Sequence, residues 1–267
     1  MEDLERWGRV DIAAIIDPAV PDALDGTADF EGWDEVDCVV ATTQSDLADC
    51  APLFRDLLSR GQSVVSTCEE LTWPWLRHPA LSAELHALAL AHGGRLLGTG
   101  VNPGFLMDSF PVAAARAARR VDRVTVYRIQ DATSRRLPFR QKIGAGLSDA
   151  AFGAKVEDGS LRHVGLGESM HFMAHYLGLP IDDWHESLGP VRGPDGGITG
   201  VRQEAHGTHA GRVLVELIFQ AAIGQDDPHD RLVLQGDPDL DLTWRGGVHG
   251  DVATSAMVQN SIHPLLA

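Results

Sequence analysis

The chain has 267 residues, of which 44% are hydrophobic and 22% are charged, so it contains enough apolar material for one large domain or two ordinary ones. Its 22 Lys and Arg residues stand against 38 Asp and Glu residues, and the resulting formal charge of −16 argues against a general role in binding nucleic acid or an anionic membrane. No run approaches the roughly 20 apolar residues of a membrane helix, the first residues are too polar for a signal peptide, and the three cysteines form no CxxC pair. We therefore expect a soluble cytoplasmic protein without a disulfide framework.

The first hundred residues alternate short apolar runs with segments of helical period. Short runs without alternation are typical of strands that are buried on both faces, and the intervening helical segments would cover those faces. This pattern predicts an α/β fold class with a parallel sheet. The predicted strands are residues 10–17, 36–43, 62–67 and 95–98, and the predicted helices are residues 47–58 and 81–92.

Polar residues follow these predicted strands, and in parallel sheets ligands bind beyond the carboxyl ends of the strands. Asp17 has the position of the acid that contacts the adenosine ribose in a dinucleotide-binding fold, although it could equally be a turn residue before Pro18. We expect a dinucleotide such as NAD or NADP at this edge. The polar residues at the strand ends are Asp17, Thr42, Thr43, Glu69, Glu70 and Asn102.

A dinucleotide-binding fold also needs a glycine-rich turn about 20 residues before that acid, where backbone N–H groups hold the pyrophosphate. The residues before Asp17 contain one glycine, Gly8, and they resemble the end of a helix with its following loop. Our expectation is therefore that the sequence begins inside the first helix of the domain, without the first strand and its phosphate loop.

Several longer motifs, in order along the chain, carry a family resemblance. They are STCEEL (66–71), GTGVNPGFLMDSFP (98–111), RRLPFRQKIGAG (135–146), HVGLGES (163–169), GVRQEAHG (200–207) and GGVHGDVATSAMVQNSI (246–262). With these motifs the chain resembles the 2,4-diaminopentanoate dehydrogenase family, which includes native NAD(P)-dependent amine dehydrogenases and is described as dihydrodipicolinate reductase-like. The resemblance runs from about residue 10 onward and implies a Rossmann-like fold; it departs only at the start, where the family carries its strand and glycine-rich loop.

The resemblance implies an NAD- or NADP-dependent oxidoreductase that interconverts a primary amine or diamino acid with a ketone and ammonia. Such a reaction needs a carboxylate that takes a proton from the amine and stabilises the cationic intermediate. We expect Glu69 to be this catalytic base and Glu70 to support it. Without the resemblance, the two acids would be interpreted as favourable charges at a helix N-terminus.

The same resemblance implies roles for other residues. Asn102 would contact the nicotinamide carboxamide, with Thr42 and Thr43 elsewhere on the cofactor, and His163 would orient the substrate as a further catalytic group. A substrate pocket would include Phe105, Phe110 and Thr254. Each has a plainer alternative: Asn102 as a turn residue, Phe110 as a core residue, the threonines as ordinary strand ends, and His163 as a structural histidine.

Other functions are less well supported. His171 and His175 share a helix face, yet the chain lacks HExxH, and we expect no metal site. A nucleophilic Cys68 would have two acidic neighbours that raise its pKa, and dihydrodipicolinate reductase proper has adjacent histidines that are absent here. Two alternatives stay open: a truncated, inactive homologue that does not bind the dinucleotide, and a reductase of another C=N substrate.

Consecutive strand patterns in the second half, separated by Gly, Asp and Pro turns, predict a mixed or antiparallel sheet in an α+β domain. Helices are expected near residues 112–120, 168–177, 181–187 and 252–262. We expect a dinucleotide-binding domain over residues 1–111, incomplete at its start, and an α+β substrate and dimerisation domain over residues 112–250. A C-terminal helix over residues 251–267 would pack back near the cofactor domain, with the substrate between the two domains. The expected assembly, implied mainly by the resemblance, is a homodimer.

Overall fold

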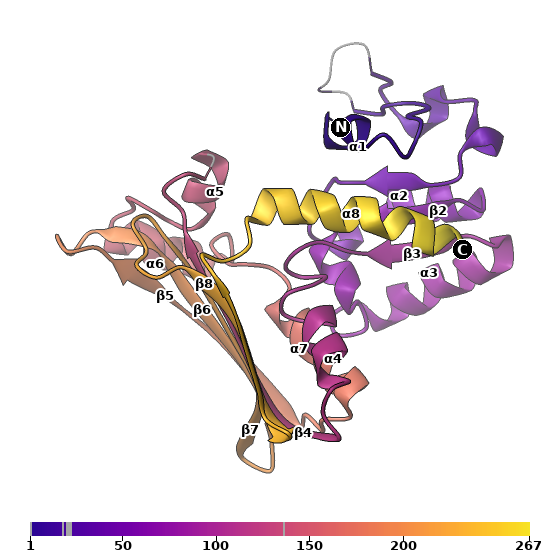
Figure 1. Cartoon of the computed structure of the whole chain (residues 1–267). Coiled ribbons are helices and arrows are strands. Elements are labelled where there is room, and N and C mark those ends of the chain that lie inside the picture. The colour runs from indigo at the N-terminus through magenta and orange to yellow at the C-terminus, as the bar shows by residue number, and fades with distance from the viewer. Residues whose placement is uncertain (1, 18, 20–22, 136) are drawn as a thin grey trace. The chain divides into compact units, whose positions relative to one another are not determined.

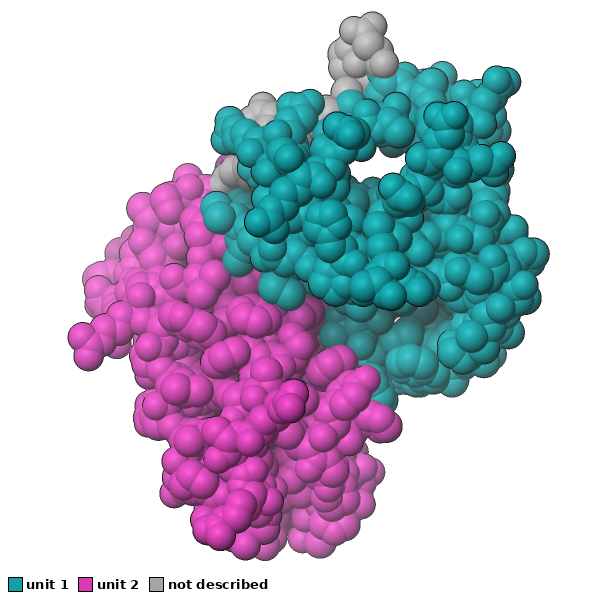
Figure 2. Space-filling model, turned by 45° about the vertical axis from the view of Figure 1, so that its right-hand side comes forward, with its two compact units in different colours: residues 1–100, 251–267 teal, residues 101–250 magenta. Residues whose placement is uncertain are grey.

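A computed structural model describes residues 2–17, 19, 23–135 and 137–267 of the chain. The chain divides into two compact units, which Figure 2 colours separately. Unit 1 comprises Met1–Gly100 and Asp251–Ala267, and unit 2 comprises Val101–Gly250. None of the helices in the described part of the chain is long and apolar enough to cross a membrane.

Unit 1 contains a three-stranded parallel sheet in the order β1-β2-β3 (Figure 1). Each connection between neighbouring strands carries a helix, as parallel pairing requires. The elements are β1 (Val39–Ala41), α2 (Leu47–Ser59), β2 (Ser63–Ser66), the short helix η3 (Glu69–Thr72), α3 (Pro79–His92) and β3 (Arg95–Gly98). The predicted α/β class with a parallel sheet is confirmed.

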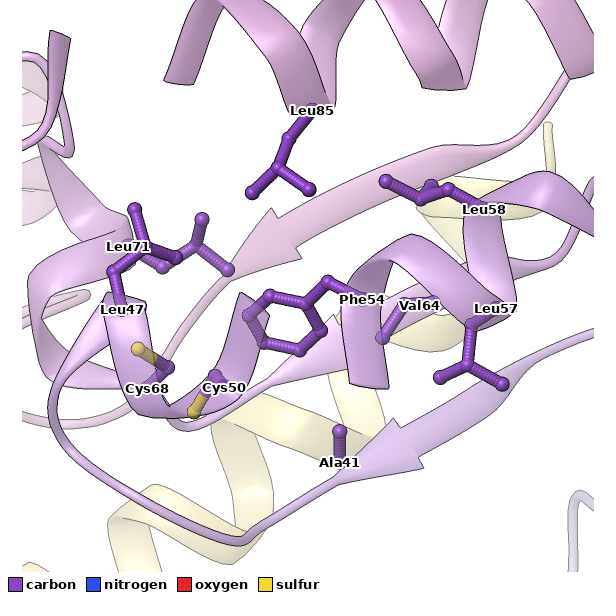
Figure 3. Close-up of a cluster of buried hydrophobic side chains, with 10 residues drawn as sticks. All are labelled: Ala41, Leu47, Cys50, Phe54, Leu57, Leu58, Val64, Cys68, Leu71 and Leu85. Carbon is purple, nitrogen blue, oxygen red and sulfur yellow. The ribbon is translucent and has the colours of Figure 1, made fainter. Parts of the chain in front are cut away.

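The sheet of unit 1 is buried on both faces because successive side chains of a strand point to opposite sides. Val64 of β2 packs with the helices α2 and α3, in the core around Phe54 that Figure 3 shows. Its neighbour Val65 packs instead against Val258 and Ile262 of the C-terminal helix α8 (Gly250–Leu266). The apolar runs therefore show no polar alternation, because both faces of each strand need apolar residues.

Helix α8 brings the last described residues back onto the sheet of unit 1. Its apolar residues cover Val65, and Ser261 Oγ donates a hydrogen bond to Thr99 Oγ1 at 3.4 Å. The short helix α1 (Glu2–Trp7) joins the same cluster, since Gln259 Nε2 donates to the carbonyl of Asp3 at 2.7 Å. Two short 3₁₀ helices, η1 (Thr27–Asp29) and η2 (Trp33–Glu35), precede β1.

The prediction of a strand over residues 10–17 is wrong. Within this segment only Ile16 forms an isolated parallel bridge, to Leu24, and residues 11–14 are exposed. A strand needs a neighbour for its backbone hydrogen bonds, and β1 pairs with β2 alone among the described strands. The β-rich composition of the segment is therefore not matched by a ladder.

Unit 2 is built on a six-stranded mixed sheet in the order β5-β6-β7-β4-β8-β9. The pairing is antiparallel except between β4 and β7, which run parallel. This confirms the predicted mixed sheet. The strands are β4 (Arg120–Asp131), β5 (Asp183–Arg192), β6 (Ile198–His209), β7 (Arg212–Ala222), β8 (His229–Asp237) and β9 (Leu240–Arg245).

One face of this sheet lies against helix α7 (Leu166–Leu177). A Cβ on Gly207 of β6 would meet Met170 Sδ of α7 at 2.7 Å, which shows how closely the helix approaches the strand. We call this side the helix face. Directly paired residues project to the same side of a sheet, so the helix face includes one row across five strands. That row consists of Gln203, Phe219, Arg128, Asp230 and Trp244.

The helices of unit 2 differ from prediction in three places. Residues 183–187 belong to β5 and are not helical, because their burial alternates with a period of two while they pair with β6. Helix α4 (Ser109–Ala115) begins earlier than expected, since Asp108 caps it, and it ends before β4. The helices α5 (Leu137–Lys142) and α6 (Asp149–Glu157) were not predicted.

Candidate active-site elements of the two units

The helix η3 of unit 1 carries the two predicted catalytic acids directly after β2. It lies so close to β3 that a Cβ on Gly98 would meet the carbonyl carbon of Leu71 at 2.9 Å, so the first glycine of the GTG motif provides room for η3. Glu69 is half-buried and Glu70 is buried. The two neighbours therefore have different environments.

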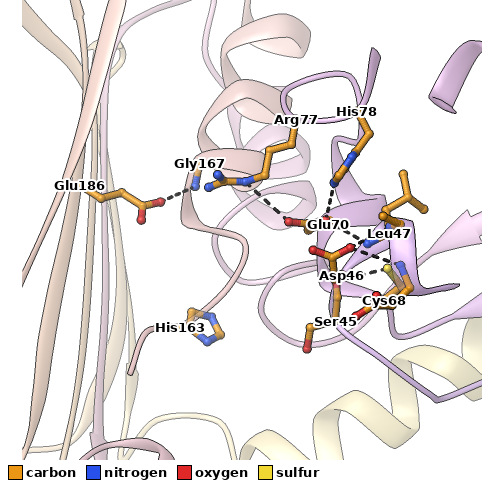
Figure 4. A network of polar contacts seen from close by, with 12 residues as sticks. Ser45, Asp46, Leu47, Cys68, Glu70, Arg77, His78, His163, Gly167 and Glu186 are labelled. Carbon is orange, nitrogen blue, oxygen red and sulfur yellow. Dashed lines mark hydrogen bonds and ion pairs between the residues drawn. The ribbon is translucent and has the colours of Figure 1, made fainter. Parts of the chain in front are cut away.

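Glu70 is held by hydrogen bonds inside unit 1 (Figure 4). Its Oε2 accepts from the backbone N–H of Leu47 at 2.9 Å and from His78 Nε2 at 2.8 Å, and Arg77 Nε lies 3.7 Å from Oε1. A buried carboxylate needs such partners to offset the loss of water. These contacts join η3 to the start of α2 and to the segment before α3, which is a structural function.

Asp46, Glu70 and His78 are also the one group of three possible metal ligands that comes together in the described part of the chain, with ligand atoms within 4.8 Å of one another. Backbone N–H groups and His78 already donate to the carboxylates of this group. His171, which shares a helix face with His175, contacts another group: its Nδ1 lies 2.8 Å from the carbonyl of Gly167. We propose no metal site.

The other predicted residues of unit 1 lie at the surface or in turns. Thr42 and Thr43 follow β1 and are exposed. Asp17 is exposed, and its Oδ1 accepts a hydrogen bond from the N–H of Ala19 at 2.9 Å, as in an Asx turn. Thr254 lies half-buried on α8.

Cys68 is unsuited to nucleophilic chemistry. Its thiol is buried and donates to the carbonyl of Ser45 at 3.3 Å. Burial raises the pKa of the Cys68 thiol well above its usual value, with Cys50 adding to the effect and Glu70 contributing less. Burial is therefore a larger cause of this raised pKa than the neighbouring acids that the sequence places beside Cys68.

In unit 2 the structure brings together two predicted residues that are 61 positions apart. Asn102 Nδ2 donates a hydrogen bond to His163 Nε2 at 2.9 Å. Since Nε2 accepts this bond, the neutral ring carries its proton on Nδ1. Asn102 is buried, and no residue that the structure describes donates a hydrogen bond to its buried Oδ1. The amide therefore presents an acceptor that a ligand donor can satisfy.

The environment of His163 keeps its ring neutral. The ring stacks on Phe219, with centroids 4.5 Å apart, and burial together with the nearby charges of Lys142 and Arg128 lowers the pKa of His163 to about 3. Gln203 is 1% exposed and binds both backbone groups of His163: the His163 N–H donates to Gln203 Oε1 at 2.8 Å, and Gln203 Nε2 donates to the His163 carbonyl at 3.0 Å. Sequence reasoning missed Gln203, although it lies in the GVRQEAHG motif.

Phe105 and Phe110 form an aromatic cluster with Trp244, which sequence reasoning also missed. The ring of Phe110 lies 4.6 Å from that of Trp244 and 5.7 Å from that of Phe105. Trp244 remains 39% exposed, so part of its apolar ring is available to a ligand. Its place in the same cross-strand row as Phe219 puts this cluster and the ring-stacking partner of His163 on one face of the sheet.

A dinucleotide fits unit 1 in part. Thr42 and Thr43 are exposed directly after a parallel strand, where polar side chains can contact such a ligand, although Thr43 Oγ1 also lies 3.7 Å from Cys50 Sγ. The start of α2 does not suit a pyrophosphate, because Glu70 accepts from Leu47 N–H and Asp46 accepts from the N–H groups of Ala48 and Asp49. Two of the protein's own carboxylates thus occupy this helix N-terminus.

Comparisons with known proteins show that the chain is similar to several dehydrogenases. A 2,4-diaminopentanoate dehydrogenase of Acetoanaerobium sticklandii is 24% identical over 247 residues, which are 86% of this chain and 70% of that protein. The structure of an amine dehydrogenase from Mycobacterium smegmatis matches with a TM-score of 0.72 and 22% identity, over 87% of this chain and 73% of the other. An aspartate dehydrogenase from Thermotoga maritima matches with a TM-score of 0.50 and 9% identity, over 100% of this chain and 92% of the other.

At these identities the two structural likenesses establish the fold alone, a Rossmann-like parallel sheet with a further mixed sheet. The family is established by a separate match: the model of the 2,4-diaminopentanoate dehydrogenase C-terminal domain covers residues 105–267, more than half of the chain. The resemblance inferred from the motifs is thereby confirmed. The chain belongs to the 2,4-diaminopentanoate dehydrogenase family and is an oxidoreductase.

Proposed function

We propose that this protein is an NAD(P)-dependent amine dehydrogenase, which interconverts a primary amine or diamino acid with a ketone and ammonia. The observation that carries the proposal is the acceptor character of the Asn102–His163 pair. His163 is neutral and its Nε2 is engaged, which leaves the buried Asn102 Oδ1 to receive a donor. The carboxamide of a nicotinamide cofactor supplies N–H donors for this acceptor, whereas a carboxylate supplies none.

Glu69 is the proposed base. Its place directly after β2 is where ligands bind in parallel sheets, and its half-buried side chain is less enclosed than that of Glu70. In amine oxidation the carboxylate would accept a proton from the substrate ammonium group and pass it to water, and in its ionised form it would then stabilise the iminium cation electrostatically. In reductive amination it would return that proton.

The cofactor would supply or accept the hydride. We propose that Asp17, Thr42 and Thr43 of unit 1, together with Asn102, contact it; Asp17 would have to leave its turn contact with Ala19 to do so. The choice between NAD and NADP is part of the test. This assignment makes unit 1 the cofactor domain and unit 2 the substrate and dimerisation domain.

Phe105, Phe110 and Thr254 are the proposed pocket residues. The two phenylalanines belong to the aromatic cluster with Trp244, which offers an apolar surface for the carbon chain of a ketone or amine. His163 would act on the substrate through Asn102, because its own Nε2 is occupied.

We further propose a cytoplasmic homodimer. The three cysteines carry no disulfide, as in reducing compartments. The face of the six-stranded sheet opposite the helix face bears charges of both signs, for example Arg202 beside Glu204 and Arg123 beside Glu216. A mixed-sign surface can match itself across a two-fold axis. Sedimentation equilibrium should give twice the chain mass, and a monomer at micromolar concentration would contradict this proposal.

The activity is tested with Glu69→Gln. Initial rates are measured for a panel of small ketones and keto acids with ammonia and either NADH or NADPH, and cofactor binding is followed by nicotinamide fluorescence. We expect Glu69→Gln to lower turnover about 10²- to 10⁴-fold while cofactor affinity stays unchanged. The matched control is Glu70→Gln, which we expect to lower the unfolding temperature because it disturbs the contacts with Leu47 and His78.

Three outcomes would contradict the proposal in different ways. Unchanged turnover in Glu69→Gln would remove this residue from the mechanism. Turnover of preformed imines without any use of ammonia would favour a reductase of another C=N substrate. A folded wild-type chain that binds neither cofactor would favour an inactive homologue. The carboxylates of Glu70 and Asp46 already accept from the N–H groups at the start of α2, so this helix end offers no free site for a pyrophosphate.

A further inference from the structure

The side chain of Asp108 holds the loop that carries Asn102 and Phe105 through hydrogen bonds. The proposed mechanism assigns no function to Asp108. Asp108 has an exposed fraction of 0%. Its Oδ2 accepts a hydrogen bond from the N–H of Gly104 at 2.7 Å, and its Oδ1 accepts from the N–H of Ser109 at 2.5 Å. Ser109 Oγ in turn donates to the carbonyl of Gly104 at 2.7 Å, which closes the loop on itself.

The same carboxylate reaches the helix that follows His163. Ser169 Oγ of α7 donates to Asp108 Oδ2 at 2.9 Å. The chain also touches the loop at Gly165, four residues before Ser169 and directly before α7: a Cβ on Gly165 would meet Pro103 Cγ at 2.5 Å, and Gly165 has a φ of +105° that favours glycine. The Asn102 loop and the 163–169 segment are therefore joined at both ends, by the Asn102–His163 hydrogen bond and by the Ser169–Asp108 hydrogen bond.

The geometry points to Asp108 as a positioning residue that sets the orientation of the Asn102 amide against His163. Its carboxylate accepts hydrogen bonds from three donors, namely Gly104 N–H, Ser109 N–H and Ser169 O–H. This inference rests on the proposed function only for its effect on catalysis. The positional effect on Asn102 and His163 stands independently of any reaction.

The loop requires that both oxygens of the residue 108 side chain accept hydrogen bonds. Burial raises the pKa of the Asp108 carboxyl, while the hydrogen bonds from Gly104, Ser109 and Ser169 oppose that rise. In Asp108→Asn, an isosteric change, the new NH₂ group would face either Gly104 N–H or Ser109 N–H, so a donor would meet a donor. The loop would then have to shift, and Asn102 would shift with it.

The first measurement is independent of activity. The imidazole ¹⁵N signals of His163, assigned by their loss in His163→Gln, report whether Nε2 accepts a hydrogen bond. We expect Asp108→Asn to move the His163 Nε2 signal in the same direction as Asn102→Ala, because both variants weaken the bond from Asn102. Ser169→Ala, which removes one donor and is the milder change, should move it less and in the same direction.

The matched control is Asp149→Asn. Asp149 also lies at the start of a helix in unit 2, but its side chain is 72% exposed and pairs with Arg192. This variant should leave the His163 signal unchanged. If the Nε2 signal of folded Asp108→Asn, or of Ser169→Ala where Asp108→Asn does not fold, equals that of the wild type, the inference is wrong.

The second measurement is a double-mutant cycle on kcat/KM for amine oxidation. Asp108→Asn should lower kcat/KM roughly 10- to 100-fold, and the double variant Asp108→Asn with Asn102→Ala should be no slower than Asn102→Ala alone. Fully additive losses would show that Asp108 does not act through Asn102. A wild type without turnover would refute the proposed function and leave the His163 signal to decide the positional inference.

Discussion

The two faces of the six-stranded sheet use the same strands for opposite purposes. On the helix face, Arg128 and Asp230 form a buried ion pair, with Nη1 3.2 Å from Oδ1 and both side chains less than 5% exposed. On the opposite face, Arg123 and Glu216 form an ion pair at 2.7 Å whose side chains are 37% and 23% exposed. The strands β4, β7 and β8 contribute to these pairs through alternate residues.

The two faces differ in the free-energy cost of burying charged groups, which is larger on the helix face. On the helix face, Asp230 Oδ2 also accepts from the N–H of Val248 at 2.7 Å, and Gln130 donates to the carbonyl of Val248 at 3.3 Å, so the charges are enclosed in hydrogen bonds. The same face carries Phe219 and Trp244, which contact the proposed site residues. On the opposite face the charged groups are partly exposed, so water offsets part of the cost of holding them, although Glu216 also contacts Thr125 and His206.

The largest expected effect comes from breaking the buried pair. Asp230→Ala would leave Arg128 buried without its partner, so we expect the free energy of unfolding to fall by about 3–5 kcal/mol. Glu216→Ala, the matched change on the opposite face, should cost at most about 1 kcal/mol. Urea unfolding at pH 7.5 measures both, and equal losses would mean that the two faces do not differ in this way.

The next largest effect is a dependence of stability on pH, which His163, stacked on the helix face, should cause. The pKa of His163 is lowered to about 3 from an ordinary value of 6.5, so between these values the unfolded chain binds a proton that the folded chain does not. Stability is therefore fully present above pH 6.5 and is lost as the pH falls toward 3. His163→Gln should remove up to about 1.4 kcal/mol per pH unit from the slope in that window. Urea midpoints at pH 7.5, 5.5 and 4.5 give the slope; a slope identical to that of the wild type would contradict the buried, neutral state of His163.

The smallest expected effect concerns the opposite face. Although burial raises the pKa of Glu216, the hydrogen bond and charge of Arg123 and the contact with His206 lower it overall. This contribution is present above the ordinary value of 4.5 and is lost as the pH falls below it. Arg123→Gln should reduce it and lower stability by less than about 1 kcal/mol, and 1 M salt should reduce the difference further. A loss that does not change with salt would indicate a buried pair.

The sequence was sufficient for the elements whose pattern is local. β3 and the strands β6 to β9 have the apolar spacing expected of them, and α8 follows its helical period. Residues 10–17 have a strand's composition but lack a pairing neighbour among the described strands. The first part of β5 was predicted as a helix because its apolar and polar residues alternate only weakly in the sequence, and its pairing with β6 is what makes it a strand. Strand formation depends on what lies next to the segment, which a local pattern does not contain.

The sequence predicted which residues belong to the candidate site, but it did not predict which of them contact one another. Asn102, His163 and the two phenylalanines were found from motifs, but their contacts join residues that are far apart in the sequence. Gln203 shows this most clearly: nothing in its local pattern indicates that its amide binds both backbone groups of His163. Asp108 could have been noted as a helix cap, although its bond to Ser169 could not.

The return of α8 to unit 1 has a consequence for biosynthesis. Unit 2 is one continuous stretch of chain, whereas the sheet of unit 1 has one face covered by residues from α8. Val65 is synthesised early, but its side chain is fully buried only after Val258 and Ile262 have been synthesised and have packed against it. The unit that is translated first is therefore the one that finishes folding last, after its successor in the chain has already been made.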